Sequence, residues 1–244
     1  TEESDPRILR QRVLDYKEQN NRDLVAEVST PVQYVWSQSI PVLPPGSEPD
    51  LHVVLYDFGI KYNTLRFLTA RSCRITVVPH QTTASEVLNL QPDGILLSNG
   101  PGDPQDLIEV IPNIQSLLGK IPIFGICLGH QLLAMALGFS TFKLKFGHRG
   151  GNHPVKDLAT GKVEITSQNH GYCVELSGER DGTTVTHINL NDGTLEGLAN
   201  KELNCFSVQY HPEAAPGPHD AEYLFERFIN LINENRTKGV GFSA

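Results

Sequence analysis

The sequence is poor in residues that build disulfide-linked or membrane-spanning proteins. Its four cysteines, Cys73, Cys127, Cys173 and Cys205, lie far apart and form no C-x-x-C pair. A chain of 244 residues needs no disulfide staples, so a reducing, cytoplasmic compartment is expected. No apolar run approaches the roughly 18 residues of a membrane helix. The charged start TEESDPRILRQRV also lacks the apolar stretch of a signal peptide, so no membrane association is expected.

Methionine and basic charge are scarce as well. Met135 is the only methionine and the chain does not begin with it, which suggests a processed product or a piece of a longer protein. The net charge is -8 and the 20 lysines and arginines are scattered, so no nucleic-acid partner is expected. No metal site is expected either, because the chain has no H-E-x-x-H segment and no C-x-x-C pair to complete a zinc finger. Its nine histidines include His148, His153, His170 and His211.

Apolar strands and amphipathic helices alternate over residues 51–140. The patterns predict strands at 51–58, 74–80, 93–99 and 121–126, and helices at 63–71, 84–90 and 106–118, the last interrupted by Pro112. The run LLAMAL after Cys127 is also helix-like. Such alternation is typical of parallel β-α-β units, whose strands are apolar on both faces.

After residue 140 the pattern changes to strand-like segments with short turns. They cover 141–146, 162–169, 183–190 and 205–210, and an amphipathic helix closes the chain at 221–235. The predicted fold class is therefore α/β, a doubly wound, mostly parallel, flavodoxin-like sheet with an added small antiparallel sheet.

The first 49 residues form a predicted arm. Ser4 and Asp5 can cap a helix in ILRQRVLDYKEQ, whose weak apolar face suggests docking, and the Pro-rich stretch IPVLPPGSEPD breaks regular structure. We expect a linker arm over 1–49 and one globular domain over 50–244.

The stretch FGICLGHQ places Cys127 where an apolar strand gives way to a helix. Its form, glycine-x-nucleophile-x-glycine, is typical of a sharp elbow that exposes a nucleophile at the carboxyl end of a strand. A thiol at a helix N-terminus is favoured as thiolate by the helix dipole. The alternative is a small buried hydrophobe, which is how most free cysteines behave.

A second segment, QYHPE, supplies the proton partner that a thiolate needs. His211 and Glu213 are two residues apart, so in extended backbone they project to the same side and Glu213 can orient the imidazole. Taken alone, the default for such a pair is a solvated surface pair.

Acyl chemistry also requires N–H donors for the developing oxyanion. One is expected from the backbone of Leu128, immediately after the nucleophile. A second must come from a neighbouring strand end, where SNGPGDP, residues 98–104, has glycines that let a ligand approach the backbone closely. The same segment can be an ordinary Pro/Gly turn.

Together, FGICLGHQLLA, SNGPGDP and QYHPEA resemble the three motifs of the class I, triad-type glutamine amidotransferases. Within that family, FGHRGGNHPV, SQNHGY and HPEAAPGPHD are similar to the small, glutamine-hydrolysing chains of carbamoyl-phosphate synthetases. The likeness begins near residue 50. Those small chains carry a further N-terminal domain that nothing in this sequence resembles.

The resemblance implies roles for individual residues. Cys127 is the implied nucleophile, His211 the acid and base, and Glu213 its orienting carboxylate. The amides of Gly100 and Leu128 form the implied oxyanion hole, and the glutamine pocket is lined by Gly102, Gln131, Asn169, Gly171 and Tyr172.

The implied reaction hydrolyses L-glutamine through a cysteinyl thioester, and the ammonia passes to a large synthetase subunit. ATP, Mg²⁺ and bicarbonate belong to that partner, and no cofactor is expected here because the chain has no G-x-x-x-x-G-K-[ST] segment. The alternatives are an amidotransferase for anthranilate or nucleotide synthesis, and a catalytically silent partner-binding module.

Overall fold

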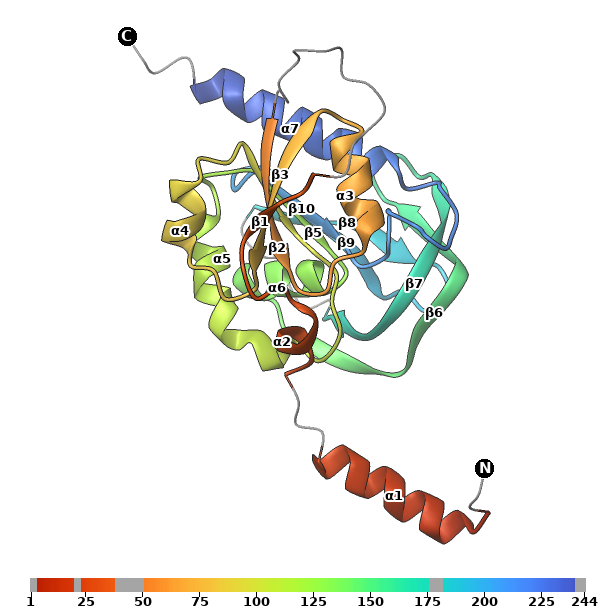
Figure 1. Ribbon diagram of the computed structural model, residues 1–244. Coiled ribbons are helices and arrows are strands. Elements are labelled where there is room, and N and C mark those ends of the chain that lie inside the picture. Colours follow the sequence, from red (N-terminus) through yellow and green to blue (C-terminus); the bar gives the residue numbers. More distant parts are fainter. Residues whose placement is uncertain (1–3, 20–22, 38–50, 176–181, 240–244) are drawn as a thin grey trace.

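The computed structural model describes residues 4–19, 23–37, 51–175 and 182–239 (Figure 1). Its helices are α1 (Pro6–Gln19), α2 (Leu24–Val28), α3 (Tyr62–Thr69), α4 (Ala84–Asn89), the 3-10 helix η1 (Pro104–Val110), α5 (Ile111–Leu117), α6 (Leu128–Ala136) and α7 (Tyr223–Gly239). Its strands are β1 (Tyr34–Val35), β2 (Leu51–Asp57), β3 (Cys73–Pro79), β4 (Gly94–Leu97), β5 (Ile123–Ile126), β6 (Thr141–Asp157), β7 (Val163–Val174), β8 (Thr183–Asn189), β9 (Leu195–Asn200) and β10 (Cys205–Val208).

Five parallel strands form the centre of the sheet in the order β3-β2-β4-β5-β10. This is the flavodoxin-like order 2-1-3-4-5, in which ligands bind beyond the carboxyl ends of the strands. The predicted doubly wound fold is confirmed.

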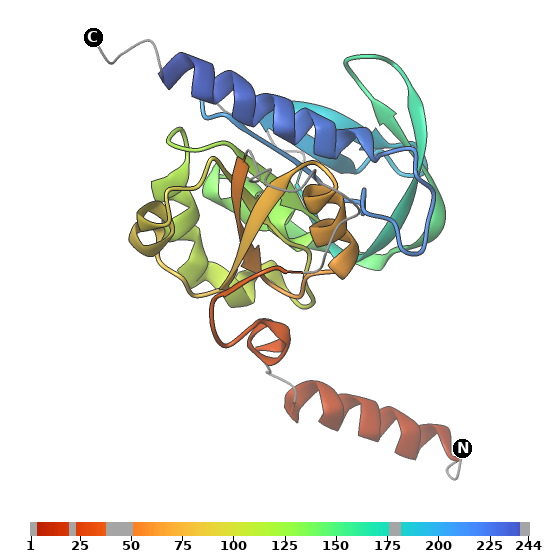
Figure 2. The ribbon, with the colours of Figure 1, turned by 45° about the horizontal axis from the view of Figure 1, so that its top comes forward.

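Helices cover both faces of these strands, because each central strand is apolar on both sides. Val53 and Leu55 of β2 pack in one core cluster with residues of α3 and α7, whereas Val54 and Tyr56 pack in a second cluster with residues of α4, α5 and α6. Figure 2 shows α7 crossing one side of the sheet while α5 and α6 lie on the other. The two clusters therefore place the central strands between two layers of helices.

The predicted antiparallel addition is present and is continuous with the parallel strands. One segment was assigned to it wrongly: residues 205–210 supply β10, which pairs in parallel with β5 and belongs to the central sheet, because pairing direction is set by the neighbouring strand and leaves no mark in the segment itself. Strands β9, β8, β6 and β7 follow β10 in the same hydrogen-bonded sheet of the described residues. Strand β9 was not predicted from the sequence. All six of its residues are buried, including Glu196, so its sequence LEGLAN lacks the alternation of apolar and polar residues that marks a half-buried strand.

The helix predicted over 106–118 differs from the structure, whereas the closing helix α7 agrees with its prediction. Pro112 does not interrupt a helix; it lies in the first turn of α5, where a missing N–H costs nothing, and residues 104–110 form the separate 3-10 helix. The apolar face predicted for α7 consists of Leu224, Phe225, Phe228, Leu231 and Ile232. All are fully buried except Leu231, which is partly buried against the same core cluster.

Part of the predicted arm is built onto the sheet. Strand β1 pairs antiparallel with β3, and Val25 of α2 is buried in the second core cluster. The helix predicted near Pro6 is α1, whose apolar side chains Ile8 and Val13 are exposed. The Pro-rich stretch lies outside the described residues, and the division at residue 50 stays a prediction. Among the described helices, none is long and apolar enough to cross a membrane.

Candidate active site

Cys127 occupies a strained corner between β5 and α6. It is the N-cap of α6 with φ 54° and ψ -103°, a conformation that L-residues rarely adopt. The flanking glycines permit the turn, since a Cβ on Gly125 would lie 2.6 Å from Gly129 O and one on Gly129 would lie 2.1 Å from Leu97 O. The structure therefore has the elbow that the sequence predicts.

His211 and Glu213 form a buried pair at the end of β10. The His211 Nδ1 to Glu213 Oε1 distance is 2.6 Å, and the side chains are 5% and 0% exposed. Burial lowers the pKa of His211, but the negative charge of Glu213 and the neighbouring Cys127 outweigh it and raise the pKa to about 10. Burial raises the pKa of Glu213, but His211 reverses this and holds it below its usual value.

The other ring nitrogen of His211, Nε2, is not engaged by Glu213. Nε2 is buried and has no regular hydrogen-bonding partner among the described residues, yet Cys127 is near enough to contribute to the raised pKa of the imidazole. The three side chains are thus arranged as sulfur, imidazole and carboxylate, with Nδ1 committed to Glu213 and Nε2 left for proton transfer.

The two expected oxyanion donors lie beside this corner. Leu128 begins α6, and the first N–H groups of a helix have no intrahelical partner. Neither Leu128 N–H nor Gly100 N–H donates a hydrogen bond to another described residue. Gly100 approaches Phe58 so closely that a Cβ would lie 2.2 Å from Phe58 O, which explains the glycine at the end of β4.

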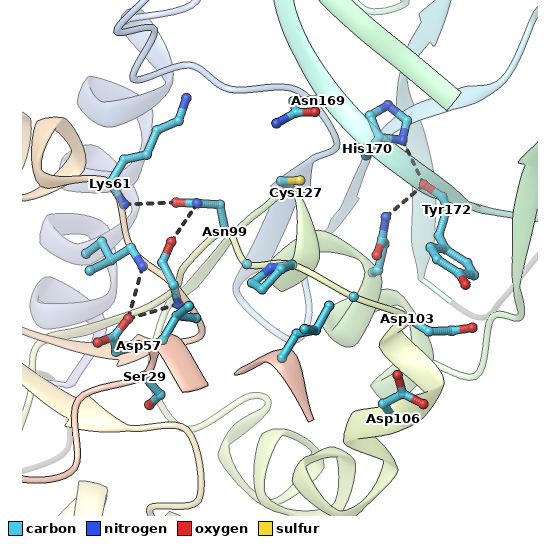
Figure 3. A pocket seen from close by; sticks show the side chains of 18 of the residues that line it. Ser29, Asp57, Lys61, Asn99, Asp103, Asp106, Cys127, Asn169, His170 and Tyr172 are labelled. Atoms are coloured by element: carbon cyan, nitrogen blue, oxygen red, sulfur yellow. Dashed lines mark hydrogen bonds between the residues drawn. The ribbon is translucent and has the colours of Figure 1, made fainter. Parts of the chain in front are cut away.

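A cavity of about 1170 Å³ opens in front of Cys127 (Figure 3). Eight of the ten predicted site residues line it: Gly100, Gly102, Cys127, Gln131, Asn169, Gly171, Tyr172 and His211. The other two, Leu128 and Glu213, adjoin Cys127 in the chain and His211 in space. Figure 3 shows Cys127 between Asn99 on one side of the cavity and His170 on the other. The structure therefore brings the whole predicted set together.

Gln131 and Tyr172 shape one wall of the cavity. Gln131 Nε2 donates to Tyr172 O at 2.8 Å and to Gln209 Oε1 at 3.1 Å, so α6 holds the end of β7. The Tyr172 ring carries Lys143 Nζ 5.6 Å from its centroid. Burial and a hydrogen bond to Asp103 raise the pKa of Tyr172 to about 12.

Three polar residues of the opposite wall were not singled out from the sequence. Asp57 Oδ1 accepts N–H bonds from Gly59 and Ile60, at 2.9 and 3.0 Å, and Asn99 Oδ1 accepts one from Lys61 at 3.2 Å. The sequence held a signal for two of them: Asp57 is the last residue of β2 and Asn99 follows β4, two neighbouring strands whose carboxyl ends meet at the ligand-binding edge.

His148, His170 and Glu196 are close enough to be considered as metal ligands, with ligand atoms within 4.8 Å of one another. Five of their six ligand atoms already have partners in Asp192, Tyr172, Gln168 and Asn189. The sixth, His148 Nδ1, makes no hydrogen bond to the described residues but lies 3.5 Å from Glu196 Oε1, and this carboxylate raises the pKa of His148, whereas burial lowers the pKa of His170 to about 4. We interpret the group as a hydrogen-bond network supporting β7 and assign no ion to it; the absence of a metal stays a prediction.

Comparison with known proteins defines the class. The family described as glutamine amidotransferase class-I matches residues 54–231, which contain the elbow, the His211–Glu213 pair and the cavity glycines. The chain belongs to this family. Among solved structures, a putative GMP synthase subunit from Thermoplasma acidophilum shares the fold, with a TM-score of 0.67 and 21% identity over 78% of this chain and 97% of that one. A glutamine amidotransferase from Thermotoga maritima aligns with a TM-score of 0.54 and 16% identity, over 79% of this chain and 86% of that one.

The sequence relatives are more specific. The carbamoyl phosphate synthase small chain of Syntrophotalea carbinolica is 59% identical over 220 residues, which cover 88% of this chain and 58% of that protein. The pyrimidine-specific small chain of Bacillus subtilis is 59% identical over 187 residues, covering 77% of this chain and 51% of that protein. The chain therefore spans little more than half the length of these relatives.

Proposed function

We propose that this chain is the glutamine-hydrolysing part of a carbamoyl-phosphate synthetase small chain. The observation that carries the proposal is the convergence of Cys127, His211 and Glu213 on one cavity, with two backbone N–H groups beside the sulfur that donate to no other described residue. The identity to carbamoyl phosphate synthase small chains supports this acceptor system over anthranilate or nucleotide synthesis.

In the first half of the proposed reaction, Cys127 Sγ attacks the side-chain amide carbon of glutamine. The carbonyl oxygen takes the negative charge and accepts hydrogen bonds from the N–H groups of Gly100 and Leu128. When the C–N bond breaks, His211 gives its Nε2 proton to the nitrogen, so that ammonia leaves and a γ-glutamyl thioester remains.

In the second half, His211 takes a proton from water, and the resulting hydroxide attacks the thioester carbon. The C–S bond breaks, glutamate is released and the thiolate returns. Glu213 keeps Nδ1 protonated in both halves, which leaves Nε2 free to exchange the proton. Gly102, Gln131, Asn169, Gly171 and Tyr172 are the proposed glutamine contacts.

The proposed fate of the ammonia is transfer to a large synthetase subunit, which supplies ATP, Mg²⁺ and bicarbonate chemistry for carbamoyl phosphate. Arginine and pyrimidine biosynthesis are the pathways this product would serve. The four free cysteines are consistent with the proposed cytoplasmic compartment.

Labelling with a glutamine-like alkylating agent tests the glutaminase. Burial raises the pKa values of Cys73, Cys173 and Cys205 to about 12, so these thiols stay protonated and react slowly near neutral pH. We expect rapid labelling of Cys127 alone in the wild type and at least ~100-fold slower labelling in His211→Ala, because proton transfer typically contributes 10²-fold or more. Equal, slow labelling of all four cysteines would indicate a silent binding module.

The acceptor is tested by capture of the partner. Purified chain should retain the large subunit of a carbamoyl-phosphate synthetase and stimulate glutamine-dependent carbamoyl phosphate synthesis by it. If the chain instead retained a protein of anthranilate or GMP synthesis, the proposed glutaminase activity would stand, but the proposed partner would be wrong.

A further inference from the structure

The carboxylate of Glu213 has a second cationic neighbour. Lys61 Nζ lies 3.2 Å from Glu213 Oε1, the same oxygen that lies 2.6 Å from His211 Nδ1. The carboxylate is completely buried, whereas the lysine side chain is 32% exposed and lines the cavity. One buried anion is thus shared by two cations.

Lys61 is fixed in this position from several sides. Its ammonium group also donates to Ala214 O at 3.1 Å, one residue beyond Glu213. Its backbone N–H donates to Asn99 Oδ1, and Asn99 Nδ2 donates back to Gly59 O at 2.8 Å (Figure 3). The loop after β2 therefore presents the ammonium group to the end of β10 in a defined geometry.

The ionisable groups that face His211 come from four elements. They are Glu213 on its own segment, Cys127 at the start of α6, His170 on β7, and Lys61 acting through Glu213. Glu213 and the sulfur stabilise the imidazolium, whereas a lysine cation on the shared oxygen partly neutralises the carboxylate and opposes that stabilisation.

This balance matters for the proposed reaction. Thioester hydrolysis needs a neutral imidazole to accept a proton from water, and a fully uncompensated buried carboxylate would hold the proton on His211 too tightly. We infer that Lys61 is a positioning residue of this site: it anchors Glu213 against His211 and lowers the affinity of the imidazole for its proton. The inference rests on the proposed function only for its consequence on turnover.

Titration of His211 by NMR in the full chain tests the electrostatic part without any need for activity. Cys127→Ser serves as the background, because it removes the sulfur charge that helps to raise the pKa of His211. Adding Lys61→Met, which keeps the length of the side chain without its charge, should raise the titration midpoint by roughly one unit. Lys61→Arg should stay near the background value. The control is Lys120→Met, an exposed lysine outside the cavity lining, which should cause no shift.

Glutamine hydrolysis with Cys127 intact tests the consequence. Lys61→Met should reduce kcat about tenfold near pH 7 and leave KM within about twofold, since a pKa one unit higher divides the fraction of neutral imidazole by ten. The kcat of this variant should approach the wild-type value as pH rises. A midpoint unchanged by Lys61→Met, or a kcat lowered equally at every pH, overturns the inference. Should Lys61→Met fail to fold, Lys61→Gln gives the same comparison with a neutral hydrogen-bonding side chain. A wild type that titrates as described but does not hydrolyse glutamine would instead refute the proposed function.

Discussion

At the scale of single residues, the site depends on charges that are buried together. His211 and Glu213 are almost inaccessible, and each shifts the pKa of the other towards the charged form. Removing either partner would leave a buried charge without compensation, which costs more than the pair itself contributes. The pair therefore links chemistry to stability.

The pKa of His211 predicts how stability depends on pH. Because its folded value, about 10, lies above its ordinary value of 6.5, the stabilisation is complete below pH 6.5 and is lost as pH rises through about 10. Glu213 has the opposite sign: its contribution is present above its ordinary value of 4.5 and is lost as pH falls through its lowered pKa. We expect the wild-type free energy of unfolding to fall by a few kcal/mol, in order of magnitude, between pH 6.5 and 10.

Urea unfolding at several pH values measures this slope. His211→Gln should flatten it, because the variant has no imidazole to titrate. His219→Gln removes an exposed histidine and should keep the wild-type slope. An unchanged slope in His211→Gln would show that other groups govern the dependence.

At the scale of elements, the elbow couples a strand end to a helix start. Cys127 N–H donates to Val208 O of β10, and Gly129 N–H donates to Ser98 O beside the end of β4. The strained residue is therefore held by the two strands that flank β5. These hydrogen bonds explain why Cys127 keeps a positive φ: the surrounding structure fixes the backbone of this residue from both sides.

Gly129→Ala tests that close packing. The added Cβ would lie 2.1 Å from Leu97 O, so β4 and α6 must separate. We expect a loss of about 2–3 kcal/mol in stability and slower alkylation of Cys127, because the elbow cannot close. Gly193→Ala is the matched control: its Cβ meets nothing within 4 Å, and only its φ of +75° opposes alanine, at about 1 kcal/mol. Equal costs in the two variants would contradict the packing argument, and chemical unfolding of both measures them.

At the scale of the whole molecule, the structure predicts where the globular unit begins. Residues 23–37 add α2 and β1 to the body, whereas the described side chains of residues 6–15 in α1 are exposed. Residues of the arm thus pack against the body ahead of the family match, which begins at residue 54, and we predict that they belong to the folded unit.

Two valine substitutions test whether α2 belongs to the folded unit. Val25→Ala removes two methyl groups from a side chain that is 2% exposed, and we expect it to cost about 2 kcal/mol. Val13→Ala alters a side chain that is 60% exposed and should change the stability by less than about 0.5 kcal/mol. Thermal or urea unfolding compares the two variants. If Val25→Ala left the free energy of unfolding unchanged, α2 would not belong to the folded unit.

Local patterns were sufficient for much of this protein. Four of the five parallel strands, α7 and the Cys127 elbow follow from spacing alone, because burial on two faces, burial on one helical face and a turn between glycines each leave a short-range signature. The fifth, β10, was predicted as a strand, but its parallel pairing with β5 was not. Strand β9 and the 3-10 helix did not follow, since a buried Glu196 and a proline in a first helical turn carry no such signature.

The sequence by itself determined which chemical groups this protein has and which strand ends present them. Only the tertiary structure decided that Lys61 meets Glu213, that His148, His170 and Glu196 share one network, and that β1 from the arm completes the sheet edge. The physical reason is distance along the chain: these contacts join segments whose order and register are set by packing of the whole sheet, so no local window of sequence contains both partners.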